Sequence, residues 1–461
     1  MIKTRFAPSP TGELHIGGAR TALFAYLFAK HNKGQFLLRI EDTDRERFVE
    51  GSIERIVESL EWLKINRDNK ELMIQSNRLE IYKRAAFDLV KAGKAYICTC
   101  SKEKLAEDRQ KQEKEGKPTR YERHCRDAGI GVSDFKDGDV IRMNMPKKGK
   151  IKFDDLIRGE IEFDLSLIDD QVLLKSDGYP TYHLASIVDD HEMGITHVIR
   201  AEEWLSSTPK HLILYQMFGW EPPLFAHLSM ILGPDKKKLS KRHGATSVLV
   251  YRDEGYLPEA LDNFMALLGW NPKDEREEFS MEELIAEFRI ENINKSPAIF
   301  DLVKLNHINS HYLTKLSDGR LKLELKSFGL SDLTSGEISI IKRGGYNTLK
   351  EATQYIKSLR QMPDYKAETL IFKKSNHKLT LLALRAVTDK FNKITEWNSD
   401  SIQKALSYVV IEQNLTNGDV FWPVRVALSG ADKSPSPVEL ANALGQIESI
   451  QRINSAINKL G

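Results

Sequence analysis

The chain has 461 residues, and its 68 Lys and Arg nearly balance its 66 Asp and Glu, giving a formal charge of +2 at pH 7. This length suggests roughly three domains, at about 150 residues each. With 41% hydrophobic and 29% charged residues, the composition excludes a disordered or fibrous protein. No run of residues approaches the ~20 apolar positions that span a bilayer. Three cysteines cannot build a disulfide scaffold, so we expect a cytoplasmic protein without membrane partners.

Residues 1–40 predict a strand, a loop, a helix and a second strand. The strand pattern at 3–7 ends at the prolines and glycine that follow it. Apolar residues then recur at helical spacing from Gly18 to about Asn32, and the apolar run 36–40 predicts a buried strand. A strand–helix–strand unit with short connections implies parallel strands, as in the doubly wound (Rossmann-type) α/β folds that bind nucleotides.

The next part of the chain predicts an α+β insertion that divides this fold. A helical pattern at 81–92 precedes a charged run at 101–126, which we expect to be mostly a solvated helical face. Strand-like segments follow at 140–145, 160–165 and 172–174. The nucleotide-binding fold resumes near residue 181 with a further strand at 197–199, and helical periodicity dominates from 257 to the end.

The near-neutral total charge conceals a gradient. Residues 314–461 contain 21 Lys and Arg against 15 Asp and Glu, a balance of +6, whereas the first 313 residues have a balance of −4. A mildly basic and helical C-terminal third is compatible with a polyanionic partner.

The first chemical motif is PSPTGELHIGG at residues 8–18, where a strand ends and a helix begins. Backbone N–H groups and the helix dipole attract phosphate at such a position. Gly17 and Gly18 lack a Cβ, so a nucleotide can come close to the backbone. His15 would then donate hydrogen bonds to charge that develops on a triphosphate. Taken alone, the tetrapeptide HIGG at residues 15–18 is explained equally well by a tight turn with a surface histidine.

The second motif is KKKLSKR at residues 236–242, with five cations in seven residues. Transfer of a phosphoryl or adenylyl group needs positive charge over the leaving pyrophosphate, and Lys238 and Lys241 could supply it. Taken alone, a solvated basic loop or a nonspecific contact with RNA explains the motif better.

Together, on a divided nucleotide-binding fold, these motifs resemble the signature pair of the class I aminoacyl-tRNA synthetases. His15-Ile16-Gly17-Gly18 resembles the HIGH element, with Gly in place of its last His, and residues 238–242 resemble the KMSKS element. Residues 5–18, 39–44, 177–190 and 200–204 resemble bacterial-type glutamyl-tRNA synthetases in particular. This resemblance covers essentially the whole chain. It implies a monomeric enzyme that uses ATP and Mg²⁺ to attach L-glutamate to tRNA through a glutamyl-adenylate.

The chemistry of glutamate agrees with this resemblance. Its side-chain carboxylate suits the two-pronged guanidinium of arginine, so we predict that Arg5 and Arg200 recognise it. Glu41 can pair with the substrate ammonium group. Pairing with the acidic residues 41–42 is the alternative role of Arg5 and, more seriously, of Arg39. The resemblance completes the glutamate pocket with Ala7, Ser9, Tyr182 and Ser186. It implies an ATP site made of His15, Gly17, Gly18, Glu203, Ile231, Lys238, Ser240 and Lys241.

All three cysteines lie in one segment. Clustered thiolates in a reducing compartment suggest a structural zinc site, and related synthetases have a comparable one. Three ordinary reduced cysteines are the alternative. The predicted ligands are Cys98, Cys100, Cys125 and Asp127, with His124 or Tyr121 as other candidates for the fourth.

The resemblance also assigns functions to five segments. These are residues 1–80 and 181–232 (the two halves of the catalytic domain), 81–180 (an insertion that binds the acceptor end of tRNA), 233–313 (the KMSKS loop and a helical stem-contact domain) and 314–461 (a helical anticodon-binding region).

Other functions are less compatible with the chain. A glutaminyl-tRNA synthetase would have a C-terminal part rich in β-barrel, and a small nucleotidylyltransferase would be shorter. A truncated tRNA-modifying relative lacks an anticodon region, and an inactive RNA-binding paralogue would have lost His15 or Lys241. One alternative stays open. Gly345 stands where some relatives have an arginine that excludes the glutamine anticodon, so the enzyme could also glutamylate tRNA for glutamine.

Overall fold

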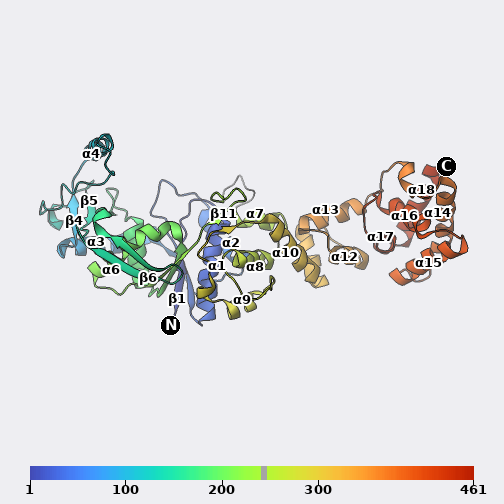
Figure 1. The fold of residues 1–461 in the computed structure, drawn as a ribbon, viewed down its shortest axis with the longest axis horizontal. Helices are drawn as coiled ribbons and strands as arrows, with labels where there is room; N and C mark the ends of the chain where they lie inside the picture. Colours follow the sequence, from blue (N-terminus) through green and yellow to red (C-terminus); the bar gives the residue numbers. More distant parts are fainter. Residues whose placement is uncertain (240–246) are drawn as a thin grey trace. The chain divides into compact units, whose positions relative to one another are not determined.

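The structure is a computed structural model that describes residues 1–239 and 247–461. It consists of two compact units. The first contains Met1–Arg252 and Pro258–Leu302, and the second contains Asp253–Leu257 and Val303–Gly461 (Figure 1). In the described part of the chain, none of the helices combines the length and the apolar character needed to cross a membrane.

The first unit is built on a seven-stranded sheet with the order β3-β2-β1-β9-β10-β6-β7. Six strands run parallel, from β3 to β6 in this order, and β7 pairs antiparallel with β6 in a hairpin at the end of the sheet. The strand order reverses between β1 and β9, and ligands of doubly wound sheets bind at such a reversal, beyond the carboxyl ends of the strands. The predicted doubly wound fold is therefore confirmed. The strands are β1 (Lys3–Phe6), β2 (Gln35–Ile40), β3 (Met73–Ile74), β6 (Lys150–Asp155), β7 (Gly159–Asp164), β9 (His197–Ala201) and β10 (Leu224–Leu228).

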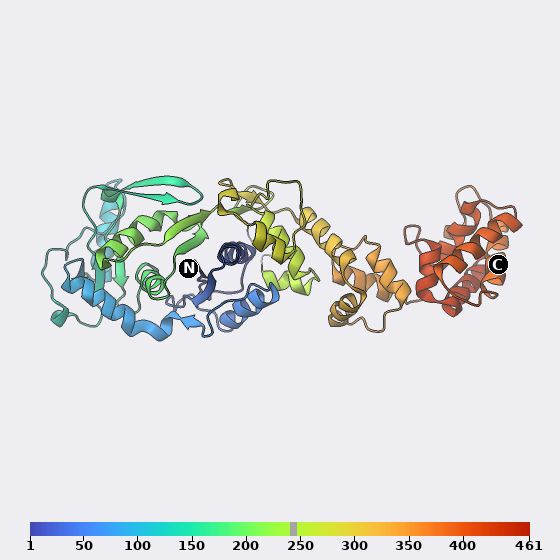
Figure 2. The same cartoon turned by 90° about the horizontal axis from the view of Figure 1, so that it is seen from below.

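Helix α1 (Ile16–His31) connects β1 to β2 and is buried along nearly its whole length. Its sequence, IGGARTALFAYLFAKH, is rich in apolar residues on every side, as expected of a helix enclosed by other elements. It packs on β1 and β2 on one side and on α8 (Pro258–Leu267) and α9 (Met281–Glu287) on the other (Figure 2). The start of α1, where the first motif lies, is thus held in a fixed position.

Residues 81–180 contribute to two sheets. Strands β4 (Ala95–Cys98), β5 (Val140–Met143) and β8 (Val172–Leu174) form a separate antiparallel sheet, against which α3 (Leu79–Lys91) packs. The charged run contains α4 (Lys102–Lys114), most of whose residues are exposed, as predicted. The hairpin β6–β7 instead joins the main sheet, and β6 was not among the predicted strands.

Helices α5 (Tyr182–Glu192) and α6 (Thr208–Phe218) flank β9 in the chain and pack on each other. Further along, β11 (Ile231–Leu232) pairs with β12 (Ala298–Ile299), and α7 (Val248–Asp253) begins just after the undescribed residues 240–246.

The second unit is helical, as predicted for residues 314–461. Most of its helices begin at a Ser, Thr or Asn whose side chain accepts a hydrogen bond from the first turn, for example Thr334, Thr348 and Thr416. Arg452 is almost fully buried and donates to the carbonyl oxygens of Leu428 (2.7 Å) and Leu359 (2.9 Å), at the ends of α16 and α13. The helices are α10 (Leu302–Lys315), α11 (Asp318–Ser327), α12 (Ser335–Lys342), α13 (Leu349–Leu359), α14 (His377–Phe391), α15 (Ser399–Glu412), α16 (Asn417–Ser429), α17 (Pro437–Leu444) and α18 (Gln446–Leu460).

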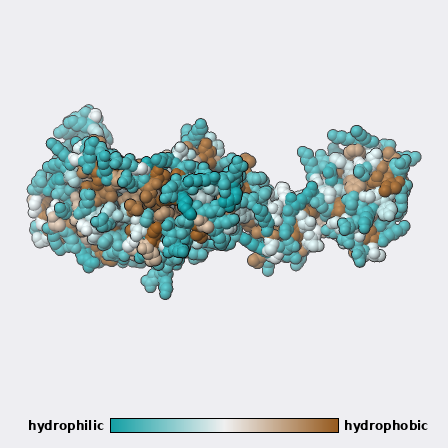
Figure 3. All heavy atoms as spheres, turned by 60° about the horizontal axis from the view of Figure 1, so that its bottom comes forward, coloured by the Kyte–Doolittle hydropathy of each residue, from teal (hydrophilic) through white to brown (hydrophobic). Residues whose placement is uncertain are grey.

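The face of the molecule shown in Figure 3 is mainly hydrophilic, with hydrophobic atoms in scattered patches. This distribution is typical of folded proteins whose apolar residues are inside.

Candidate active site

His15 forms the N-cap of α1. Its Nδ1 accepts a hydrogen bond from the backbone N–H of Gly18 at 3.1 Å, which leaves its Nε2 as a hydrogen-bond donor. A Cβ on Gly17 would lie 3.1 Å from this Nδ1, so glycine is the residue that leaves the ring in place. His15 is exposed at the surface. The surrounding protein atoms still desolvate its ring, and this desolvation, together with the Lys238 ammonium, lowers the pKa of His15. His15 is therefore a neutral donor at the start of a helix.

The second motif begins at a tight turn after β11. The backbone N–H of Leu239 donates to the carbonyl oxygen of Ile231 at 3.1 Å, and that of Gly233 donates to Lys237 at 2.8 Å. The turn directs Lys238 toward Glu203, and their Nζ and Oε2 atoms are 2.8 Å apart. Ser240 and Lys241, which the sequence assigns to the ATP site, lie outside the described residues.

The turn and His15 belong to one region. Ser247 forms a β-bridge with His15, and the N–H of Val248 donates to the carbonyl oxygen of Leu14 at 2.9 Å. The described residues on either side of 240–246, Leu239 and Ser247, therefore contact β11 and the start of α1. The structure brings His15, Lys238, Glu203 and Ile231 into the same part of the first unit.

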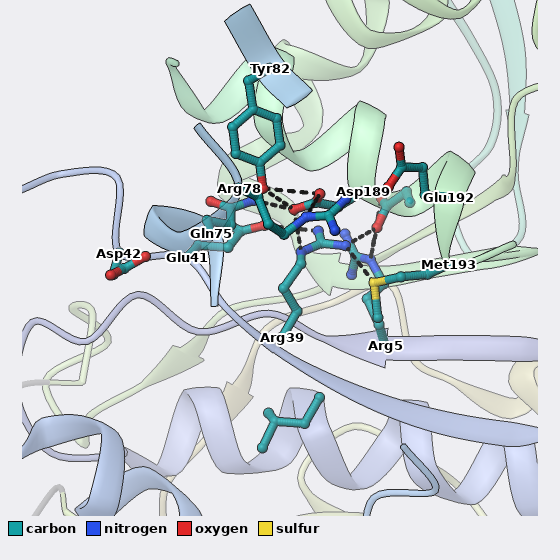
Figure 4. Close-up of polar contacts among 12 residues, drawn as sticks. Arg5, Arg39, Glu41, Asp42, Gln75, Arg78, Tyr82, Asp189, Glu192 and Met193 are labelled. Atoms are coloured by element: carbon teal, nitrogen blue, oxygen red, sulfur yellow. Dashed lines mark hydrogen bonds and ion pairs between the residues drawn. The ribbon is translucent and has the colours of Figure 1, made fainter. Parts of the chain in front are cut away.

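Arg39 lies at the centre of a buried cluster of charges (Figure 4). Its terminal nitrogens donate to Asp190 at 2.7 Å and to Glu41 at 2.9 Å, and its Nε lies 3.6 Å from Asp189. The alternative role of Arg39, a charge partner of Glu41, is thus the one that the structure shows. Arg5 donates through its Nε to Asp190 at 3.1 Å, and not to Glu41 or to Asp42.

This cluster shifts the pKa values of two acidic groups in opposite directions. Burial raises the pKa of Glu41, and the adjacent Arg39 only partly offsets this effect. Burial would also raise the pKa of Asp190, but the guanidinium groups of Arg5 and Arg39 together lower it. Asp190 is therefore a charged anchor for Arg5. Arg5 donates to it through the Nε, and its two terminal nitrogens donate no hydrogen bond to another described residue.

Arg200, at the end of β9, is 6% exposed and has a different environment. All five of its donors face neutral groups in the described structure. A buried cation normally has an anionic partner. Arg200 is therefore a buried positive charge that a bound carboxylate could neutralise. Its partners are His227 (3.0 Å), Tyr182 (3.1 Å), His211 (3.3 Å), the carbonyl of Trp204 (3.2 Å) and Thr208 (2.9 Å).

The other predicted pocket residues lie on neighbouring elements. Tyr182 begins α5, packs on Trp204 with ring centroids 4.3 Å apart, and accepts from Arg200. Ser186 lies one turn later on α5 and is 2% exposed. Ala7 and Ser9 follow the end of β1, where Ser9 is exposed. These positions surround the strand reversal between β1 and β9, with Arg5 on one side and Arg200 on the other.

The three cysteine thiols form a compact group next to β4. Their sulfur atoms lie within 4.8 Å of one another. The Tyr121 hydroxyl lies 3.2 Å from the sulfur of Cys98 and 3.6 Å from that of Cys100. Of the candidate fourth ligands, Tyr121 is therefore the one at the thiols, because His124 pairs with Asp108 at 2.8 Å and Asp127 is not part of the group.

The fold, the HIGH-like helix start and the adjacent lysine turn define a class of protein, and comparison with known families agrees. A family model described as tRNA synthetases class I (E and Q), catalytic domain, matches residues 1–307. A second, described as an anticodon binding domain, matches residues 319–457. The chain belongs to the class I tRNA synthetases of the glutamate and glutamine group.

Within this class, the similar proteins are named as glutamate enzymes. A glutamate–tRNA ligase of Dehalococcoides mccartyi strain CBDB1 is 44% identical over 480 aligned residues, which cover 100% of this chain and 98% of that protein. One of Thermodesulfovibrio yellowstonii is 43% identical, with 99% and 100% covered. The crystal structure of a glutamate tRNA ligase from Elizabethkingia meningosepticum in complex with its amino acid has a TM-score of 0.89 at 36% identity, with both chains fully covered. That of Elizabethkingia anophelis has a TM-score of 0.87 at 36% identity, with 99% of each chain covered.

Sequence reasoning did not find four residues that the site depends on. Asp190 anchors Arg5, His227 and His211 contact Arg200, and Asp155 contacts His227. Their partners are distant in the chain, and no local pattern marks such contacts. The one local signal was the pair of adjacent aspartates, 189–190, which directly follows the apolar pair 187–188 in α5.

Proposed function

We propose that this chain attaches L-glutamate to tRNA in an ATP-dependent reaction that passes through glutamyl-adenylate and releases pyrophosphate and AMP. The observation that supports this most strongly is Arg200, a buried cation with only neutral described partners, beside Arg5 at the strand reversal. Two guanidinium groups at a nucleotide-binding edge suit a substrate with an extra carboxylate. The names of the similar proteins support the same substrate.

In the first step, an oxygen of the glutamate α-carboxylate attacks the α-phosphorus of ATP, and the bond to the leaving pyrophosphate breaks. His15 is suited to donate through Nε2 to the phosphate oxygens, because Gly18 fixes its other nitrogen as an acceptor. Lys238 supplies positive charge from the turn after β11. The family implies Mg²⁺ bound with ATP, which would offset further phosphate charge. Lys241 and Ser240 keep the roles that the sequence predicts for them.

In the second step, a hydroxyl of the terminal ribose of tRNA attacks the activated carbonyl carbon, and AMP leaves. Glu203 and the backbone near Ile231 are proposed to hold the adenosine during both steps. Glu203 is paired with Lys238 in the structure, so ATP binding would exchange this ion pair for contacts with the nucleotide. The pair is largely exposed, and its loss therefore costs little.

Selection of glutamate over glutamine follows from charge. A glutamine amide cannot neutralise Arg200, which would then stay buried without a counter-charge. Aspartate lacks one methylene and would not reach both arginines, a smaller penalty of about 1–3 kcal/mol. Glu41, Ala7, Ser9, Tyr182 and Ser186 are proposed to complete the pocket. No comparison favours a second activity on tRNA for glutamine, and aminoacylation of both purified tRNAs would decide that alternative.

We propose a structural zinc site made of Cys98, Cys100, Cys125 and Tyr121. Three sulfur atoms within 4.8 Å of one another and a phenol oxygen at the same point match the donor number of a closed zinc site. We expect one zinc per chain by elemental analysis, and a Tyr121→Phe variant that loses zinc to a chelator faster. Purified protein without zinc would refute this site, and unchanged chelation in Tyr121→Phe would refute the role of Tyr121 alone.

The remaining proposals concern tRNA and the working form. We propose that residues 81–180 bind the acceptor end, 233–313 contact the stem and 314–461 bind the anticodon, while 1–80 and 181–232 form the catalytic domain. The match of residues 319–457 to an anticodon binding domain supports the last assignment of tRNA contacts. We propose a cytoplasmic monomer, consistent with three free cysteines.

Glutamate-dependent exchange of pyrophosphate into ATP, measured with and without tRNA, tests the proposed function. We expect exchange with glutamate and none above background with glutamine or aspartate at equal concentration. Arg200→Lys should lower kcat/KM for glutamate by about 100-fold, because lysine lacks the two-pronged geometry. Lysine in place of the exposed Arg84 is the matched control and should have no effect. Exchange that is equal for glutamate and glutamine would refute the proposal.

A further inference from the structure

Two lines of buried or half-buried polar side chains meet at the Arg200 guanidinium. One begins at Asp155, at the end of β6, and continues through His227 on β10. The other begins at His183 on α5 and continues through His211 on α6. Asp155, His227 and His211 are each at most 3% exposed. The proposed reaction gives none of these four residues a chemical step.

The sheet register puts the first line together. His227 on β10 is the direct neighbour of Arg200 on β9, and Phe225 on β10 is the neighbour of Asp155 on β6. Phe225 and His227 are two residues apart on β10, and alternate residues of a strand point to the same face. The side chains of Asp155, His227 and Arg200 therefore lie on one face of three adjacent strands. Asp155 is further fixed by backbone N–H groups of Ile157 and Arg158, at 3.0 and 2.9 Å.

Hydrogen-bond chemistry fixes the tautomer of His227. The Asp155 carboxylate lies 2.6 Å from His227 Nδ1 and can only accept, so Nδ1 bears the proton. Nε2 then carries a lone pair and accepts a hydrogen bond from the Nε of Arg200 at 3.0 Å. Burial lowers the pKa of His227, with Arg200 adding to this effect and Asp155 opposing it. The imidazole therefore stays neutral beside the guanidinium.

The second line obeys the same rule. Arg200 only donates, so the Nδ1 of His211 at 3.3 Å must accept from it. The proton of His211 is then on Nε2, which donates to the Nδ1 of His183 at 3.0 Å. Burial and the nearby Arg200 keep the pKa of His211 well below its ordinary value. Both imidazoles thus accept from Arg200 without bringing any negative charge to it.

We propose that Asp155, His227 and His211 are positioning residues that orient Arg200 for the side-chain carboxylate of glutamate and leave its charge uncompensated. This inference rests on the proposed function. A protein carboxylate in direct contact would orient Arg200 equally well, but it would neutralise the cation and compete with the substrate. A neutral imidazole gives the orientation alone, and the Asp155 charge is held one side chain away. The full attraction of the guanidinium is then reserved for a ligand that is negatively charged.

Asp155→Asn tests the relay through His227. The amide oxygen can keep the backbone bonds of Ile157 and Arg158, whereas the amide N–H₂ faces His227 Nδ1 and forces the proton onto Nε2. That proton would point at the N–H of Arg200 and turn the guanidinium away. We expect KM for glutamate to rise by about tenfold or more, with kcat and KM for ATP within about twofold, and the preference for glutamate over glutamine to fall. Asp262→Asn, which alters another buried carboxyl group of the same unit, should leave KM for glutamate unchanged.

Variants of His227 separate this role from simple packing. His227→Gln offers an amide oxygen as the acceptor for Arg200 and should raise KM for glutamate less than His227→Leu. In the His227→Leu background, Asp155→Asn should produce no further rise, since its effect passes through the imidazole. Thermal unfolding is measured for every variant, and if Asp155→Asn does not fold, the comparison of His227→Gln with His227→Leu decides.

The outcomes are distinct. If the wild-type protein shows no glutamate-dependent exchange, the proposed function fails. If it does, and Asp155→Asn keeps its KM for glutamate and its preference over glutamine, the positioning role is wrong. Equal effects of Asp155→Asn in the wild-type and His227→Leu backgrounds would also overturn it, because Asp155 would then act independently of His227.

Discussion

The buried histidines near Arg200 make the stability of the first unit depend on pH. Burial lowers the pKa of His183 to about 3, with smaller effects of Lys210 and Arg200, whereas an unfolded histidine titrates near 6.5. The unfolded chain thus binds more protons below about pH 6.5, and stability is complete above that pH and falls as the pH decreases toward 3. Histidines 211 and 227, whose pKa values are also lowered, act in the same direction.

We predict that the midpoint of thermal unfolding of the first unit decreases between pH 7 and pH 5. His183 alone accounts for up to about 2 kcal/mol of this loss. His183→Gln should reduce the slope of stability against pH, while Gln in place of the exposed His307 should not. An unchanged slope in His183→Gln would show that this residue takes up its proton in the folded state as readily as in the unfolded one.

His15 has two roles that substitutions can separate. We predict that His15→Ala and His15→Asn both slow glutamate-dependent exchange by about 100-fold, because both lose the Nε2 donor. Only His15→Ala should lower thermal stability, by about 1 kcal/mol, because asparagine can still cap α1. Normal exchange in His15→Asn would show that capping, and not the Nε2 donor, is what the reaction needs.

At the scale of single residues, the sequence predicted types of group better than their partners. The order of the motifs and the chemistry of glutamate single out His15, Arg5 and Arg200, and the structure brings these residues to one edge of the sheet. The sequence could not indicate that Arg5 pairs with Asp190 or that Arg200 pairs with His227, because those contacts join residues that are far apart in the chain. The predicted fourth zinc ligand, Asp127, is not at the thiols, and the sequence could not favour Tyr121 over it for the same reason.

At the scale of elements, apolar patterns worked for the buried strand β2 and failed for β6, which lies between β10 and the edge strand β7. The predicted run 36–40 corresponds to β2, which is buried, whereas β6 was missed. Its sequence, KIKFDD, is dominated by charged residues, and Lys150 and Lys152 pair with Glu162 and Glu160 across the hairpin. The residues of β6 alternate between exposed and buried or half-buried positions, so this strand has no continuous apolar run like that of β2.

Two helical glycines provide a matched test of helix packing in the second unit. A Cβ on Gly336 in α12 would lie 2.6 Å from the Cα of Ala443 in α17, whereas one on Gly319 in α11 would meet nothing within 4 Å. We predict that Gly336→Ala destabilises the second unit by about 1–3 kcal/mol, since the helices must separate. Gly319→Ala should be neutral or stabilise it by up to about 1 kcal/mol, because alanine favours helix.

Urea unfolding of the full chain, followed by circular dichroism, would measure both effects. The two units can unfold separately, so each transition is fitted by itself. Equal stabilities of Gly336→Ala and Gly319→Ala would show that α12 and α17 do not pack as closely as described.

At the scale of the whole molecule, the net charge differs between the C-terminal segment and the rest of the chain, in agreement with their different proposed functions. The +6 balance of residues 314–461 fits a segment that matches an anticodon binding domain, and the −4 balance before it includes the acidic groups that hold Arg5 and Arg39. The helical character of this C-terminal segment was predictable from periodicity alone. The attachment of β6 and β7 to the main sheet was not, because it joins residues near 155 to residues near 225.

We predict that salt raises KM for tRNA much more than KM for glutamate. Between 50 and 200 mM salt, KM for tRNA should rise by about tenfold or more, because binding the RNA backbone releases counterions. KM for glutamate should change little, because its arginine partners are buried and weakly screened. Steady-state aminoacylation at several salt concentrations measures both constants. Parallel increases would contradict a binding mode for tRNA that depends on phosphate contacts.

The order of strands in the main sheet also determines when the protein can fold during its synthesis. Strand β1 pairs with β2 early, but its other neighbour, β9, begins only at His197. At about 5–20 residues per second, the ribosome needs roughly 10–40 s to produce the intervening chain. During that time one edge of β1 has no partner strand from the sheet, and β10 arrives later still. We therefore expect the separate sheet of β4, β5 and β8 to form first, and the site around Arg5 and Arg200 to be completed only when the second half of the sheet leaves the ribosome.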